Sequence, residues 1–175
     1  MGQLGLHLRV NDAELAALAA HEGYASVMEY ITEELEESKF GSGDVAETDK
    51  SWAYIHSALL GIDPDGPLSC EPQDASLAEP GMARFAIMGT EVLEASGDDY
   101  VGLTRKAQVG EVATELAAIS LDDLSARVTR AHQRFGATGD AGEAAEYAAS
   151  WFEGLVDFYR ETAVRGDHVI FTVSF

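Results

Sequence analysis

The chain has 175 residues, of which 46% are hydrophobic, which predicts one globular domain over residues 1–175 and excludes a disordered protein. Its 31 acidic and 11 basic residues give a net charge of −20, so nucleic acid and anionic membranes are poor partners. The lone Cys70, together with the lack of a secretory segment or an apolar run of about 18 residues, predicts a cytoplasmic protein.

The first predicted element is a strand with one buried face, because its apolar residues recur with a period of two. These residues are Leu4, Leu6, Leu8 and Val10. Asn11 and Glu14 then have the spacing of a capping box, which predicts a helix that ends by Gly23. The residues expected on the inward, apolar face of this helix are Leu15, Leu18 and Ala19. A second helix is expected over residues 24–38.

The second predicted helix lies in a strongly acidic stretch. Eleven Asp and Glu residues occur from Asp12 to Asp49, against the single basic residue Lys39. This composition predicts an exposed acidic face that serves solubility alone or docks a cationic partner, and a basic protein is the expected partner in the second case. The residues predicted to form the face are Glu29, Glu33, Glu36 and Glu37.

Residues 48–61 are the most distinctive local stretch. Thr48 can cap the start of a helix and Gly61 its end, and Trp52 and His56 fall on one apolar face between them. Two roles for His56 are open. It is either a neutral, hydrogen-bonded residue of the core, or it lines a pocket with Trp52.

The next stretch, residues 61–82, contains all four prolines of the chain. Proline removes a backbone donor and fixes φ, so no long regular element is expected here. Such a segment either covers the core as a rigid loop or takes part in a functional site.

The remaining elements complete an α+β pattern. Strands are predicted at 83–88 and at 169–175, and residues 100–103 form either a short strand or an extended entry to the next helix. Helices are predicted at 105–119, 120–135 and 143–164. We expect a single domain in which amphipathic helices pack on a small mixed sheet that includes the N- and C-terminal strands. The residues expected on one buried face of that sheet are Leu6, Leu8, Phe171 and Val173.

The sequence contains no specific catalytic or metal-binding motif. The turn around Gly66 lacks the Glu that a calcium loop needs, and the glycines of residues 136–142 lack the Lys-Ser/Thr of a phosphate loop. The five histidines do not have the spacing of a zinc site. We therefore predict no catalytic residue, no metal ligand and no cofactor, while a site assembled from distant positions remains open.

Several landmarks occur in a fixed order along nearly the whole chain. The first is the N-terminal strand, followed by Lys50-x-Trp52-x-x-Ile55-His56-x-x-Leu59-x-Gly61. The others are Pro67-Leu68, Gly89-Thr90-Glu91, Tyr100-Val101, Phe152-x-x-Leu155-x-x-Phe158-Tyr159 and Gly166-Asp-His-Val-Ile. Together they resemble the YfbM-like family of bacterial proteins of unknown function. The resemblance implies an α+β domain whose activity and ligands are not established.

Two hypotheses about function follow. The sequence favours a non-enzymatic binding or protein-interaction protein with an acidic surface, because charge is prominent and no catalytic constellation is present. The alternative is an enzyme or small-ligand binder whose pocket lies under the proline-rich segment. The residues predicted to form that pocket are Trp52, His56, Glu91 and Tyr100.

Overall fold

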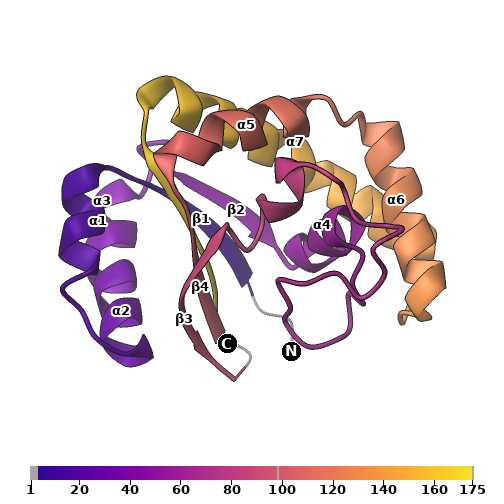
Figure 1. Ribbon diagram of the computed structural model, residues 1–175, viewed down its shortest axis with the longest axis horizontal. Helices are drawn as coiled ribbons and strands as arrows, with labels where there is room; N and C mark the ends of the chain where they lie inside the picture. The colour runs from indigo at the N-terminus through magenta and orange to yellow at the C-terminus, as the bar shows by residue number, and fades with distance from the viewer. Residues whose placement is uncertain (1–3, 98, 175) are drawn as a thin grey trace.

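The computed structural model describes residues 4–97 and 99–174, and within them the centre is a five-stranded sheet of order β2-β1-β5-β4-β3 (Figure 1). β1 and β5 pair from Leu4 opposite Ser174 to Val10 opposite His168, so the predicted placement of both terminal strands in one sheet is confirmed. Every pairing among these strands is antiparallel, where a mixed sheet was predicted. Phe175, predicted to end the last strand, lies outside the described residues. The strands are β1 Leu4–Val10, β2 Val45–Asp49, β3 Glu91–Ser96, β4 Asp99–Thr104 and β5 His168–Ser174.

Helices cover both faces of this sheet, so the α+β domain has three layers (Figure 1). One face carries α1 Asp12–Leu18, α2 Tyr24–Tyr30, the π-helical turn η1 Ile31–Glu36 and α3 Glu37–Lys39. The other face carries α4 Ser51–Leu60, the 3₁₀ turn η2 Met82–Phe85, α5 Lys106–Ala117 and α7 Ala141–Arg165, and α6 Leu121–Phe135 packs on α4 and α7. None of the helices in the described ranges is long and apolar enough to cross a membrane.

The terminal strands bury residues on both faces of the sheet. Their register places Leu8 opposite Ile170 and His7 opposite Phe171. Because side chains alternate along a strand, Leu8 and Ile170 pack toward α1 and α2, and Phe171 packs toward α4–α7. The prediction of a single buried face for Leu6, Leu8, Phe171 and Val173 is therefore wrong. Helices on the second face bury the residues that a one-sided sheet would leave in water.

Helix α4 begins later than predicted. Thr48 belongs to strand β2, and its Oγ1 donates to the Gly5 carbonyl oxygen at 3.2 Å, so its predicted role as a cap is wrong. Lys50 occupies the N-cap position without a side-chain capping bond. The predicted end is confirmed, because Gly61 takes the left-handed conformation with φ +73° and its N–H donates to Ser57.

The segment predicted as a strand at 83–88 is a 3₁₀ turn followed by a turn before Gly89. His7 Nε2 and Tyr159 Oη donate to the Ala86 carbonyl oxygen, at 3.0 and 2.8 Å, and Tyr100 Oη donates to that of Met88 at 2.9 Å. Buried carbonyls need donors, and here side chains take the place of a neighbouring strand. The strand that pairs with β4 at this edge of the sheet is instead β3, which begins at Glu91, and the opposite edge is β2.

The proline-rich segment is fixed to the helices beneath it. Within the described chain, residues 62–81 contain no helix or strand, as predicted. The Gly61 carbonyl oxygen at the end of α4 accepts the Asp74 N–H at 2.9 Å. On α6, Arg134 pairs with Asp74 at 2.7 Å and Arg127 pairs with Glu79 at 2.5 Å. These contacts support the interpretation of a rigid covering loop.

Candidate functional site

Two of the four predicted pocket residues, Trp52 and Tyr100, lie in the core between the sheet and α4–α7. The Trp52 ring centroid is 6.0 Å from that of Phe171 on β5. Tyr100 Oη donates to the Met88 carbonyl and lies 3.3 Å from Cys70 Sγ, so the thiol is the donor in that second contact. Burial raises the pKa of the Tyr100 phenol. The contact with Cys70 had no signal in the sequence.

His56 is buried on α4, with 1% of its surface exposed. Its Nε2 donates to the Ser69 carbonyl oxygen at 2.8 Å, which ties the helix to the proline-rich segment. Burial lowers the pKa of His56 from 6.5 to about 4, so the ring is neutral near pH 7. His56 therefore has the geometry of a neutral, hydrogen-bonded core histidine, which is the first of the two roles considered from the sequence.

Replacing His56 by glutamine should lower the free energy of unfolding at pH 7 by about 1–3 kcal/mol. The shorter amide cannot fill the space of the ring and also keep the bond to Ser69. Urea denaturation of both proteins at pH 7 measures the difference. An unchanged midpoint and slope would contradict a structural role for this imidazole.

His56→Gln should also make the free energy of unfolding depend less on pH below about 6.5. His56 has a pKa of about 4 when folded against 6.5 when unfolded, so the unfolded chain binds more protons between these values. Stability therefore falls as pH drops from about 6.5 to 4, by up to about 1.4 kcal/mol per pH unit for each such histidine. His7, whose pKa burial also lowers to about 4, adds to this loss in both proteins. Equal pH slopes in wild type and His56→Gln would contradict the assignment.

Glu91, the fourth predicted pocket residue, lies on a different face of the sheet. It pairs in register with Leu103, whose side chain packs toward α1 and α2. Its carboxylate accepts hydrogen bonds from Arg105 Nε at 2.6 Å and Nη2 at 2.9 Å, and these bonds lower the pKa of Glu91. The structure thus places Trp52 and Tyr100 in one core and Glu91 outside it, so the four residues do not converge on one site.

The predicted acidic face is interrupted at Glu36. Glu29, Glu33 and Glu37 are exposed, whereas Glu36 is half-buried and lines a cavity that also contacts Trp151. Glu36 is the last residue of the π turn η1, which interrupts the α-helical spacing on which the predicted face was based. Burial raises the pKa of the Glu36 carboxyl. Docking of a basic protein on this face stays a prediction.

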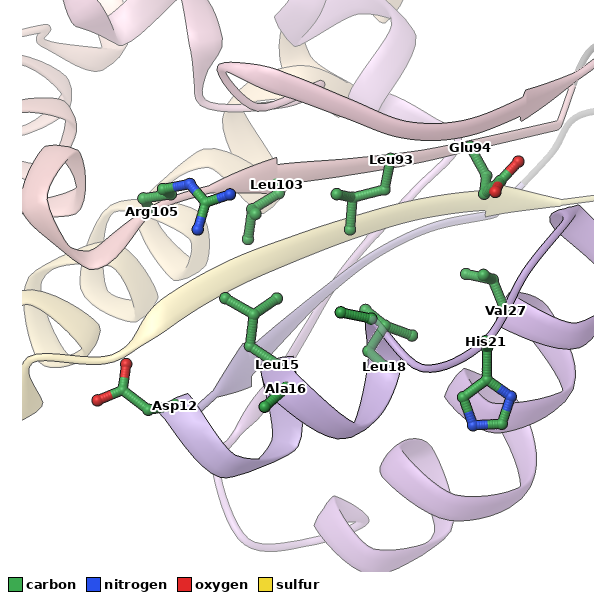
Figure 2. A pocket seen from close by; sticks show the side chains of 11 residues that line it. Asp12, Leu15, Ala16, Leu18, His21, Val27, Leu93, Glu94, Leu103 and Arg105 are labelled. Carbon is green, nitrogen blue, oxygen red and sulfur yellow. The ribbon is translucent and has the colours of Figure 1, made fainter.

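A cavity that the sequence did not predict lies between helix α1 and edge strand β3, and we call it the α1–β3 groove (Figure 2). Its volume is about 400 Å³, within the range of roughly 300–1,000 Å³ that is typical of small-molecule sites. In Figure 2 apolar side chains of the helices face apolar side chains of the strands across it. These are Leu15, Leu18 and Val27 on one side and Leu93 and Leu103 on the other.

Two local features position the walls of the groove. At the start of α1, Asn11 Oδ1 accepts the N–H of Glu14 at 3.0 Å, and the Glu14 carboxylate accepts that of Asn11 at 2.8 Å. This capping box, which the sequence predicted, fixes where α1 begins. In β3 the register shifts between Val92 and Glu94. Such a bulge re-aims side chains, and consecutive residues Leu93 and Glu94 both line the groove.

The charged groups at one end of the groove are bonded to one another. Lys106 Nζ donates to both Asp12 carboxylate oxygens, at 2.8 and 2.6 Å, and His168 Nε2 lies 3.0 Å from Oδ1. The hydrogen bond from Lys106, followed by that from His168, lowers the pKa of Asp12. Arg105 is held in the bidentate pair with Glu91. Each of these charges therefore already has an opposite charge beside it.

The other end of the groove carries His21 and Glu94 (Figure 2). His21 Nδ1 lies 3.0 Å from Ser26 Oγ, and its ring stacks on Tyr30 with centroids 4.7 Å apart. Glu94 is half-buried, and no residue within 4–97 or 99–174 forms a hydrogen bond or ion pair with its side chain. Over the same ranges, no group of three or more His, Cys, Asp or Glu residues is placed to hold a metal ion.

The sequence held only part of the information for this site. Leu15 and Leu18 were predicted to face inward on α1, and both line the groove. Strand β3 was missed, because its bulge interrupts the period-two pattern that reveals a strand. No local signal was available for Leu93 or Glu94.

Comparison with known proteins gives a family without an assigned function. A family model described as a domain of unknown function (DUF1877) matches residues 1–172. The crystal structure of YfbM from Escherichia coli, a protein of unknown function, is similar with a TM-score of 0.66 and 19% sequence identity. That match covers 98% of this chain and 99% of the other, and at this identity it concerns the fold. No curated protein matches the chain. The resemblance inferred from the sequence is confirmed.

Proposed function

The chain belongs to the DUF1877 family, and we propose that it is a non-enzymatic binding protein that holds a small, mainly apolar molecule in the α1–β3 groove. The observation that carries the proposal is the groove itself, with a volume of about 400 Å³ and facing apolar walls. Filling it with an apolar molecule removes leucine surface from water, which is the main source of affinity in such sites. The free thiol of Cys70 supports a cytoplasmic location for this role.

The charged groups beside the groove favour binding over catalysis. Hydrogen bonds from Lys106 and Arg105 lower the pKa values of Asp12 and Glu91, respectively. A carboxylate stabilised in this way is a weak general base, whereas acid–base enzymes move carboxyl pKa values toward the working pH. These paired carboxylates are therefore unsuited to acid–base catalysis, which supports binding as the role of the groove.

A homologous series of linear alcohols tests the groove. Butan-1-ol, pentan-1-ol and hexan-1-ol should each shift the amide NMR signals of Leu15, Leu18 and Leu93 on titration into the ¹⁵N-labelled protein. Affinity should rise by about fourfold for each added methylene, because burying one CH₂ contributes about 0.8 kcal/mol. The absence of shifts at these amides, or an affinity that is independent of chain length, would contradict the proposal.

Two neighbouring alanines of α1 provide a matched pair of variants. Ala16 and Ala17 are both exposed, but only Ala16 lines the groove. Ala16→Trp should occlude the groove and weaken hexan-1-ol binding by roughly 15- to 60-fold, the effect of losing two to three buried methylenes. Ala17→Trp should leave the affinity unchanged. Equal effects of the two substitutions would assign the alcohol to another site.

A further inference from the structure

The two ends of the α1–β3 groove differ in whether their charged groups have partners. At the first end, Arg105 makes two bonds to Glu91 and Asp12 is bonded to Lys106 and His168. A ligand charge there would have to displace a charge-assisted pair, and bidentate Arg–carboxylate pairs are among the stronger ones. This end is therefore a poor anchor for an anion or a cation.

Glu94, at the second end of the groove, lacks such a pairing within the described residues. Its side chain is half-buried and has no bonded partner in the part of the chain that the structure describes. In Figure 2 it stands beyond Leu93 at the end of the row of apolar side chains. A partly desolvated carboxylate without a counter-charge gains from a cation that reaches it.

The charge of the whole protein acts in the same direction. With a net charge of −20 the surrounding field raises the local concentration of small cations and lowers that of anions. The apolar walls require an apolar body on the same molecule. Both requirements are met by an amine attached to a short hydrocarbon chain or ring.

We propose that the ligand of the α1–β3 groove is an amphiphilic amine, with its ammonium group on Glu94 and its hydrocarbon body between Leu15, Leu18, Leu93 and Leu103. This inference rests on the proposed function and adds the chemical class and orientation of the ligand. The ammonium donates to the Glu94 carboxylate while the opposite end of the molecule lies toward Leu103. Arg105 keeps its bonds to Glu91 throughout.

Three six-carbon probes, hexylamine, hexan-1-ol and hexanoate, separate charge from apolar contact. Hexylamine and hexan-1-ol carry the same six-carbon hydrocarbon chain, whereas the carboxylate of hexanoate contains the sixth carbon, so about fourfold is allowed for its missing methylene. Hexylamine is protonated at pH 7 as a lysine side chain is. Dissociation constants for each probe would be measured by NMR titration of the wild type, Glu94→Gln and Glu111→Gln. Glu111 is an exposed residue of α5, in the opposite helical layer, and serves as the matched loss of one negative charge.

Wild type and Glu111→Gln should bind hexylamine about tenfold more tightly than hexan-1-ol, the size expected for a hydrogen bond to a charged group. Glu94→Gln should reduce the affinity for hexylamine to that for hexan-1-ol. The affinity for hexan-1-ol itself should not change. Glu94→Lys should reverse the preference, so that hexanoate binds more tightly than hexylamine.

The outcomes distinguish this inference from the proposed function. If hexan-1-ol binds but hexylamine binds no more tightly, or hexanoate binds best to the wild type, the amine assignment is overturned and the apolar site stands. The amine assignment is also overturned if Glu111→Gln weakens hexylamine binding as much as Glu94→Gln does. If none of the three probes shifts the groove amides, both proposals fail.

Discussion

Replacing Arg9 by alanine should lower the free energy of unfolding by about 3–5 kcal/mol, the range for removing one partner of a buried charge network. Arg9 lies on β1 with only 2% of its surface exposed. Its Nη1 donates to Asp44 at 2.8 Å, its Nε to Thr162 Oγ1 at 3.0 Å, and its guanidinium lies 5.2 Å from the centroid of the Phe158 ring. The alanine leaves both a cavity and an under-compensated carboxylate.

Two further variants separate packing from charge at this position. Arg9→Met keeps most of the side-chain volume, so it should cost clearly less than Arg9→Ala, and the difference measures the cavity. Arg165 binds the same Asp44 oxygen at 2.9 Å, but its side chain is 51% exposed. Arg165→Ala should therefore cost less than about 1 kcal/mol. Urea denaturation measures the free energy of unfolding of all three variants. Equal losses of stability for Arg9→Ala and Arg165→Ala would contradict the claim that burial makes Arg9 the more important residue.

Gly102→Ala should destabilise the protein by about 3 kcal/mol, at the upper end of the usual range for overpacking. A Cβ at Gly102 would lie 2.0 Å from the Met88 carbonyl oxygen and 2.7 Å from Tyr100 Cε1. Backbone cannot rotate away as a side-chain tip can, so the turn at Met88 must move. That turn carries the carbonyl that accepts the Tyr100 hydroxyl.

Gly110→Ala is the matched control for this substitution. Gly110 lies within α5, and no atom would meet its Cβ within 4 Å. Alanine is favoured over glycine in a helix, so this variant should gain up to about 1 kcal/mol. Thermal unfolding should therefore shift down for Gly102→Ala and up for Gly110→Ala. Similar melting temperatures for the two variants would show that the close approach at Gly102 relaxes at little cost.

Local signals were enough to predict much of the fold. The terminal strands follow from alternation, α1 from the capping box at Asn11, and the end of α4 from Gly61. The start of α6 at Ser120 is also as predicted, with its Oγ accepting the Asp123 N–H. Each of these features depends on residues a few positions apart, so a pattern in the chain describes it completely.

Elements that depend on distant residues were predicted poorly. Residues 83–88 have the composition of a strand, but the Ala86 carbonyl is bonded by His7 and Tyr159, and the segment turns instead. Thr48 has the local pattern of a helix cap, but pairing with β1 uses it in a strand. In both cases a partner far away in the sequence outweighs the local preference.

The candidate site shows the same division. Local patterns were enough to predict an acidic α+β domain, the terminal strands, the capped helix α1 and the inward position of Leu15 and Leu18. Three features depend on packing between distant segments: helices cover both faces of the sheet, Glu91 lies apart from Trp52, and a bulge in β3 brings Leu93 and Glu94 to α1. Helix caps and periodicity act within a few residues, whereas a groove exists only between surfaces that strand register and layer packing bring together.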